Sequence, residues 1–126
     1  RVPPSRRDLL LDRGIILTLT NRENVYIPRT KLSDYLLSET HPTGRWKAKF
    51  LRAIGFDETN TEELRQALIT ILHSQEVKET QSSPPGIKYV IEGLLQTPTA
   101  TLVQVRTIWI IDTGQDRPRF VTIYPI

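Results

Sequence analysis

The sequence predicts an α+β fold in which N-terminal helices pack on a C-terminal antiparallel β-sheet. Apolar residues recur at helical spacing between residues 31 and 74, whereas the alternation typical of strands begins after Gly86. A chain of 126 residues fits one domain and can bury a core without disulfides, and it contains no cysteine. We therefore expect an N-terminal arm over residues 1–24 and a single α+β domain over residues 25–126.

The arm and the first helix come first along the chain. A basic cluster with two prolines opens the sequence, and the branched run IILTLT at residues 15–20 predicts a short strand. The segment KLSDYLL places Leu32, Tyr35 and Leu36 at helical offsets. This spacing predicts a short helix over residues 31–37.

A second helix is predicted from Thr43 to about Ile54, with Thr43 as its cap and Gly55 as its left-handed stop. Lys47 lies on the stripe that faces the core, because the positions three, four and seven residues later are Phe50, Leu51 and Ile54. The basic residues on the opposite side are Arg45, Lys49 and Arg52. A cation at the start of a buried stripe either reaches past the core into water or points into a cleft, and the spacing leaves both possibilities open.

The clearest helical pattern covers residues 60–74. Asn60 and Glu63 suggest a capping box at its start. Its apolar stripe consists of Leu64, Leu68, Ile71 and Leu72. His73 falls in the last turn, where a histidine most often interacts with the helix dipole at the surface. The polar segment EVKETQSSPPG, residues 76–86, is then expected to be a linker.

Strand patterns fill the remainder of the chain and predict an antiparallel meander. The strands expected are 87–95, 101–111 and 119–126, separated by turns at TPTA and DTGQDRP. In the middle strand, one face should carry Val105, Thr107, Trp109 and Ile111. The other face should carry Arg106, Ile108 and Ile110.

Composition excludes several classes of protein. The formal charge of +3 fits an RNA, DNA or acidic protein partner, although a mixed solvated surface also explains it. Because the chain has two histidines and no cysteine, we expect no metal site. The sequence contains neither a glycine-rich phosphate loop nor a nucleophile elbow, so we expect no nucleotide cofactor and no hydrolase of that type. No apolar run approaches a membrane span, and no signal peptide is recognisable, so we expect a cytoplasmic protein without a membrane partner.

The polar residues that remain suffice for metal-independent RNA cleavage, which needs an acid, a base and groups that stabilise charge on the phosphate. His41 suits the acid or base role near neutral pH, and Lys47 suits the phosphate charge. Hydroxyl groups would come from Thr107, Thr122 and Tyr124. The RNA backbone would be held by Arg45, Lys49 and Arg52. Trp109 either stacks on an unpaired base or packs in the core.

The wording of several segments resembles an uncharacterised bacterial domain family over residues 25–126. The segments are KLSDYLLSETHPTGRWKAKFLRAIGF, GIKYVIEGLL, VRTIWIIDTG and PRFVTIYPI. Members look like a helix pair followed by a sheet, and they often lie beside a gene for a small acidic β-barrel protein. The resemblance therefore implies a toxin and its antitoxin.

The same order of elements is similar to the barnase, EndoU, colicin and RelE group of ribonucleases. Thr107 and Trp109 look like the serine-x-tryptophan strand pair of colicin D, a tRNA anticodon nuclease. His41 and Lys47 would then match its helix-borne histidine and lysine. Two positions depart from that pattern: Thr107 stands where colicin D has serine, and Lys47 follows His41 whereas the lysines of colicin D precede its histidine.

These observations favour a metal-independent endoribonuclease toxin that acts on tRNA or other structured RNA. A small acidic antitoxin or immunity protein would neutralise it. The alternative is a non-catalytic protein- or RNA-binding module that uses the same sheet and basic helix. The two hypotheses differ in whether His41, Lys47, Thr107 and Thr122 converge in one cleft.

Overall fold

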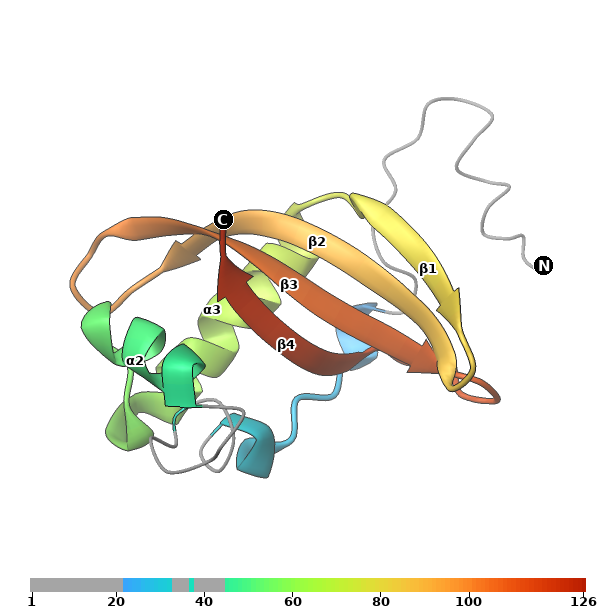
Figure 1. Cartoon of the computed structure of the whole chain (residues 1–126), viewed down its shortest axis with the longest axis horizontal. Helices are drawn as coiled ribbons and strands as arrows, with labels where there is room; N and C mark the ends of the chain where they lie inside the picture. The colour runs from blue at the N-terminus through green and yellow to red at the C-terminus, as the bar shows by residue number, and fades with distance from the viewer. Residues whose placement is uncertain (1–21, 33–36, 38–44) are drawn as a thin grey trace.

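Four antiparallel strands form one sheet, in the order β1-β2-β3-β4. The computed structural model describes residues 22–32, 37 and 45–126, and it has the predicted α+β architecture (Figure 1). The strands are β1 (Glu79–Ser83), β2 (Gly86–Gln96), β3 (Leu102–Asp112) and β4 (Arg119–Pro125). The helices are η1 (Arg22–Asn24), α2 (Arg45–Ala53), η3 (Glu58–Asn60) and α3 (Thr61–Ser74). The expected meander is therefore confirmed, with one strand more than the sequence predicted.

The additional strand corrects the prediction of a linker over residues 76–86. β1 pairs with β2 from Glu79 opposite Val90 to Ser83 opposite Gly86. Its polar sequence ETQSS shows no alternation, and most of its side chains are exposed, so backbone pairing with β2 decides its conformation. A Cβ on Gly86 would lie 2.3 Å from the Ile111 carbonyl oxygen, so the start of β2 needs glycine for its close approach to β3.

Helix α2 ends as the sequence predicts. Gly55 has a φ of 108°, and the Phe56 amide donates to the Leu51 carbonyl at 2.9 Å. The Gly55 amide also donates to the Arg52 carbonyl at 3.1 Å, which completes a Schellman motif. The predicted Thr43 cap lies outside the described residues.

The start of α3 differs from the expected capping box of Asn60 with Glu63. Asn60 makes no side-chain cap on α3, because its carboxamide accepts from the Asp57 amide at 2.8 Å. Asp57 in turn accepts from the Thr59 amide at 2.8 Å, so the capping box closes the short η3 turn that precedes α3. The prediction placed the box one turn too late, since the sequence gives no sign of η3.

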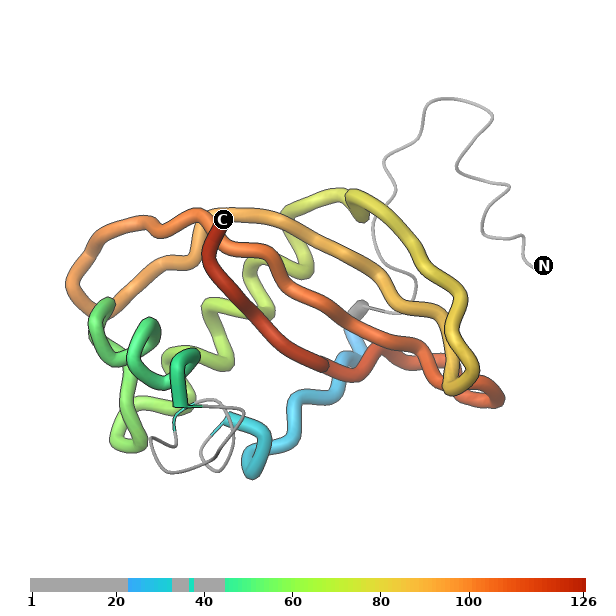
Figure 2. The backbone as a smooth tube through the Cα atoms, in the orientation of Figure 1, coloured from blue at the N-terminus to red at the C-terminus, as the bar shows by residue number. Residues whose placement is uncertain are grey.

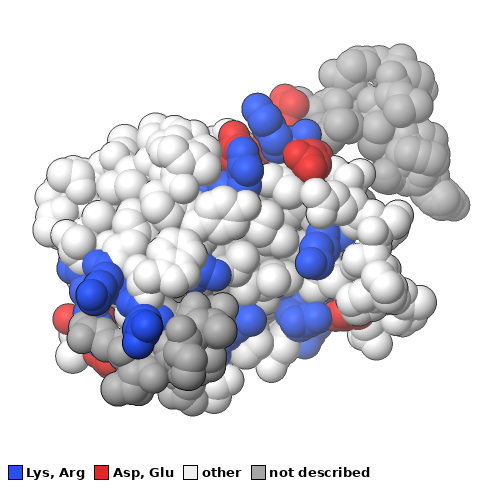
Figure 3. Space-filling view, in the orientation of Figure 1, with Lys and Arg blue, Asp and Glu red and all other residues white. Residues whose placement is uncertain are grey.

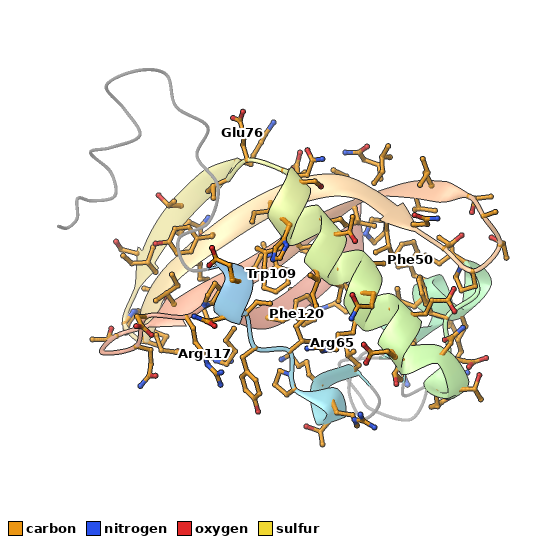
Figure 4. All side chains as sticks on the ribbon, turned by 180° about the vertical axis from the view of Figure 1, so that it is seen from behind. Phe50, Arg65, Glu76, Trp109, Arg117 and Phe120 are labelled. Carbon is orange, nitrogen blue, oxygen red and sulfur yellow. The ribbon has the colours of Figure 1, made fainter. Side chains whose placement is uncertain are left out.

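Helix α3 covers one face of the sheet and builds the core with it (Figure 4). Its predicted stripe is confirmed, because Leu64, Leu68, Ile71 and Leu72 are all buried. On the sheet, Trp109 and Phe120 form an edge-to-face pair with ring centroids 5.2 Å apart. Within the described residues, no helix covers the opposite face of the sheet, which Figure 3 shows and which is called here the open face.

The segment after η1 lies along the start of β4 (Figure 2). Tyr26 forms a parallel bridge with Arg119, in which its amide donates to the Pro118 carbonyl at 2.8 Å. The Phe120 amide donates back to the Tyr26 carbonyl at 3.0 Å. Residues 29–32 are helical, whereas the rest of the helix predicted over 31–37 is described only at residue 37, and the strand predicted over 15–20 lies outside the described residues.

Candidate functional site

Helix α2 places its basic residues in two environments. Lys47 is 9% exposed and shares the inner stripe with the buried Ala48 and Leu51. Arg45 and Lys49 are exposed on the outer side of the helix, and Figure 3 shows a group of Lys and Arg side chains over α2. The predicted separation of Lys47 from Arg45 and Lys49 is therefore confirmed.

The Lys47 ammonium reaches the edge of the sheet. Its Nζ donates to Thr122 Oγ1 on β4 at 2.5 Å, and it lies 5.4 Å from the centre of the Trp46 ring. The residue is mostly buried along the core stripe, and its charged end is bonded to a hydroxyl at the edge of the sheet. The Lys47 side chain therefore ends against β4, where the spacing alone had left its direction open.

A second polar group lies on the open face of the sheet. The strand register places Arg106 on β3 between Glu92 on β2 and Tyr124 on β4. Arg106 Nε donates to Glu92 Oε2 at 2.7 Å, and the guanidinium carbon lies 5.9 Å from the centre of the Tyr124 ring. The hydrogen bond to Glu92 raises the pKa of Arg106, so this guanidinium remains charged.

These two groups form one polar strip. Thr122 and Tyr124 are two residues apart on the same face of β4, which corresponds to about 7 Å. We call Lys47, Glu92, Arg106, Thr122 and Tyr124 the open-face cluster. It contains two cations, one carboxylate and two hydroxyl groups, which is a set able to hold a phosphate and to exchange protons with it.

Sequence reasoning included three members of this cluster and missed Glu92 and Arg106. The strand alternation placed Arg106 on the face opposite Thr107, which was the available signal. Cross-strand register brings Glu92, Arg106 and Tyr124 side by side, and register depends on turns and packing that a single strand sequence does not reveal.

Thr107 and Trp109 lie together on the other face, inside the core, as the strand alternation predicts, so Thr107 does not converge with Lys47 and Thr122 in one cleft. Both are 0% exposed. Thr107 Oγ1 donates to the Ile91 carbonyl at 2.7 Å and accepts from Trp109 Nε1 at 2.8 Å. The hydroxyl of Thr107 and the indole of Trp109 thus satisfy each other within the core. Thr107 offers no group to RNA in this structure. Trp109 packs in the core, which is one of the two roles expected of it.

Trp46 has the exposure that base stacking requires. Its side chain is 52% exposed on the turn of α2 that also carries Lys47. The sequence shows both tryptophans, but it does not show which one the fold buries. Of the two tryptophans, Trp46 is the one whose ring is exposed.

Two further predicted site residues are Arg52, which is partly buried, and His41. Arg52 donates to the Leu37 carbonyl at 2.7 Å and forms an ion pair with Glu58, so its guanidinium joins α2 to neighbouring segments. His41 lies outside the described residues. His73 is exposed in the last turn of α3, as expected for a surface histidine.

Two further properties concern the described part of the chain. Within residues 22–32, 37 and 45–126, no three His, Asp or Glu side chains are grouped so that they could hold a metal ion. No helix in this part is both long and apolar enough to cross a membrane.

The chain matches a family model described as a domain of unknown function, DUF6883, over residues 18–126. It belongs to this family. No curated protein matches the chain. The family therefore supplies no activity, and the resemblance inferred from the sequence segments is confirmed only as far as an uncharacterised domain family.

Among solved structures, the chain is similar to one from the "contact-dependent growth inhibition toxin - immunity protein complex" of Klebsiella pneumoniae 342. The TM-score is 0.62 at 17% sequence identity, with 79% of this chain and 98% of the other chain covered. At that identity the similarity establishes the fold of the DUF6883 domain and leaves its chemistry to the site itself.

Proposed function

We propose that this DUF6883 domain is the toxin of a toxin–immunity pair and acts as a metal-independent endoribonuclease on tRNA or other structured RNA. The observation that carries the proposal is Lys47, a residue that is 9% exposed and whose ammonium is bonded to Thr122 and lies beside the exposed Trp46. A cation held at the end of a buried stripe, beside an exposed aromatic ring, is suited to meet an RNA phosphate and an unpaired base. Contact with an RNA phosphate would use its charge.

The reaction follows from the chemistry of RNA. A base removes the proton of a 2′-hydroxyl, the 2′-oxygen forms a bond to the adjacent phosphorus, and the bond from phosphorus to the 5′-oxygen breaks. An acid protonates the leaving 5′-oxygen, so the products carry a 2′,3′-cyclic phosphate and a 5′-hydroxyl. The phosphorane formed on the way bears extra negative charge, which fixed cations and hydroxyls stabilise.

The open-face cluster supplies groups for most of these roles. Lys47 and Arg106 stabilise the phosphorane charge, and the hydroxyls of Thr122 and Tyr124 donate to its oxygens. Two groups are candidates for the proton transfers: His41, proposed from the sequence, and Glu92, whose side chain is 17% exposed beside Arg106. Thr107 keeps β3 in place from the opposite face.

Residues outside the cluster bind the remainder of the RNA. Arg45 and Lys49 hold the phosphate backbone from the outer side of α2, and Arg52 adds charge at the end of the helix. Trp46 takes the stacking role first expected of Trp109. Because tRNA is a cytoplasmic molecule, the proposed place of action is the cytoplasm.

The similarity to a chain of a toxin–immunity complex supports a protein partner as well. An immunity protein that blocks this surface should be acidic, because it has to cover Arg45, Lys47 and Lys49 at once. Its acidic side chains would occupy the positions of RNA phosphates. Co-expression of such a protein should relieve growth arrest caused by this chain in bacteria.

Lys47→Met tests the proposal most directly. Methionine keeps the apolar packing along α2 but removes the charge, so cleavage of a labelled tRNA should fall by about 100-fold or more. The cleavage rate at saturating RNA and the free energy of unfolding are to be measured on the same protein. Lys49→Met on the exposed side of the same helix is the matched control, and it should weaken RNA binding while leaving that rate nearly unchanged.

The products provide an independent check. The parent chain should release ends with 2′,3′-cyclic phosphate in the presence of a chelator, and it should not cut RNA whose 2′-hydroxyls are replaced by hydrogen. Folded Lys47→Met protein that cuts at the parent rate removes this lysine from the mechanism. A parent chain that binds RNA and cuts none of the RNAs tested favours the non-catalytic binding module.

A further inference from the structure

A pocket of about 350 Å³ lies where the turn between β3 and β4 meets the segment after η1. It is lined by Tyr26, Asp112, Thr113, Gln115, Arg117 and Arg119. The guanidinium carbon of Arg117 lies 4.6 Å from the centre of the Tyr26 ring, and Tyr26 is 42% exposed. An aromatic ring and a planar cation thus form a stacked pair at the surface of a pocket whose other side chains are polar.

The backbone holds this pair in place. The Tyr26 amide donates to the Pro118 carbonyl at 2.8 Å, and the Phe120 amide donates to the Tyr26 carbonyl at 3.0 Å. These two bonds use the residues on either side of Arg119, and the first of them, Pro118, directly follows Arg117 in the chain. The opposite wall is fixed by the turn, in which the Gln115 amide donates to the Asp112 carbonyl at 2.8 Å and Gly114 adopts a φ of 84°. A rigid pocket loses little entropy when a ligand binds.

The second arginine of the pocket is fixed by its side chain. Arg119 Nε donates to Asp112 Oδ2 and Arg119 Nη2 donates to Asp112 Oδ1, both at 3.0 Å. Asp112 neutralises one of the two arginines, so the lining keeps a net positive charge. A planar platform, a net positive charge and the side-chain carboxamide of Gln115 together match the parts of a nucleotide, which are a flat base with polar edges and a phosphate.

The position of the pocket relates it to the open-face cluster. Arg119 and Thr122 both lie on the open face of β4, three residues apart, which corresponds to about 10 Å. A short extended RNA segment can span that distance. The pocket therefore lies beside the point where the proposed function places the reacting phosphate.

We propose that the pocket of Tyr26, Arg117 and Arg119 binds an unpaired nucleotide of the RNA substrate, next to the nucleotide whose phosphate reacts. This inference rests on the proposed function for the identity of the ligand. The base stacks on the pair of Arg117 and Tyr26, and the net positive charge of the lining attracts its phosphate. An acidic side chain of a protein partner would use the arginines but not the ring, which is why RNA fits the pocket better than a carboxylate does.

The probe is a fluorescent single-stranded RNA dodecamer with 2′-O-methyl sugars, which cannot be cut by attack of the 2′-oxygen. Binding is measured by anisotropy on the full chain. Tyr26→Ala should weaken binding about 10-fold, because stacking on an aromatic side chain contributes this much per base. Tyr26→Phe keeps the ring and should bind within about twofold of the parent.

Two further comparisons separate stacking from charge. Arg117→Lys keeps the charge but loses the planar group, so it should weaken binding by a factor similar to Tyr26→Ala while the dependence on salt stays the same. A dodecamer of abasic ribose phosphates offers no base. The parent, Tyr26→Ala and Arg117→Lys should therefore bind it equally.

The outcomes distinguish this inference from the proposed function. If the parent cleaves RNA but folded Tyr26→Ala binds the dodecamer as tightly as the parent, the pocket is overturned and the nuclease stands. If the parent cuts no RNA but its binding depends on Tyr26 and on the bases, the nuclease is overturned and the pocket stands. Loss of affinity for the acidic partner alone, with RNA binding intact, would make the pocket a protein-docking surface and overturn the inference.

Discussion

The two faces of the sheet carry the same residue types in opposite surroundings. Thr107 on the core face is 0% exposed, and its hydroxyl is bonded to the Ile91 carbonyl and to the indole of Trp109. Thr122 on the open face is half-buried, and its hydroxyl accepts from the Lys47 ammonium. Both residues are threonines on strands, but the hydroxyl of Thr107 completes the packing of β3, whereas the hydroxyl of Thr122 holds the charged end of Lys47 at the edge of the sheet.

The two tryptophans show the same contrast. Trp109 is buried against Phe120, and Trp46 is 52% exposed beside Lys47. Residue type alone therefore does not decide whether a polar or aromatic residue supports the fold or contacts a ligand. What decides the role of such a residue is its burial and whether its polar atoms have hydrogen-bond partners. A single substitution can change either property.

The largest effect should come from removing the core aromatic. Trp109→Ala should lower the free energy of unfolding by about 3–5 kcal/mol, because it leaves a large cavity between α3 and the sheet. Trp46→Ala is the matched control and should change stability by less than about 1 kcal/mol, while weakening RNA binding. Urea denaturation measures both. Equal losses of stability for the two variants would contradict the contrast between the faces.

The two threonines should give a smaller difference of the same kind. Thr107→Val leaves the buried indole N–H of Trp109 without its acceptor, so it should cost about 1–3 kcal/mol of unfolding free energy. Thr122→Val should cost less, because its site is half-exposed and water can replace the hydroxyl. Its cleavage rate should fall more than that of folded Thr107→Val protein. The contrast would be broken if Thr107→Val lost cleavage at unchanged stability.

A still smaller effect is expected from the ion pair of Asp112 with Arg119 at the margin of the open face. Hydrogen bonds from Arg119 hold the pKa of Asp112 below its ordinary value of 3.8. The pair therefore stabilises the fold above pH 3.8, and this contribution is lost as the pH falls through the lowered pKa. The melting temperature of Asp112→Asn should lie slightly below that of the parent at pH 7, and the gap should narrow as the pH falls below 3.8. A gap that stays constant over this range would show that the carboxylate charge does not matter.

The smallest change concerns the turn between β2 and β3, which belongs to neither face. Ala100 has a φ of 65°, a conformation that costs an L-residue roughly 1–2 kcal/mol and a glycine little. Ala100→Gly removes this cost, but glycine also gives the unfolded chain more freedom, which cancels part of the benefit. We therefore expect a net increase of about 0.5 kcal/mol in the free energy of unfolding. Calorimetry checks it, and a fall in melting temperature would contradict the prediction. The stabilised variant would also make the cost of Thr107→Val easier to measure.

Local signals were sufficient for most elements of the fold. The buried stripe of α3, the left-handed end of α2 at Gly55 and the two long hairpin strands follow from spacing and turn residues within short segments. Strand β1 could not be predicted, because its polar sequence gains its conformation from hydrogen bonds to β2. The capping box was misplaced for a similar reason, since Asn60 bonds to Asp57 in a turn that has no sequence signature.

The sequence by itself determined the α+β class, the basic outer side of α2 and the presence of Lys47 on the inner stripe, because these depend on periodicities of a few residues. Only the tertiary structure decided which residues share a site. Lys47 meets Thr122 across 75 positions of the chain, and Arg106 meets Glu92 across 14. Such contacts depend on strand register and helix packing, which are properties of the whole chain. The tertiary structure therefore places Thr107 and Trp109 in the core, Thr122 half-buried on the open face and Trp46 exposed on α2.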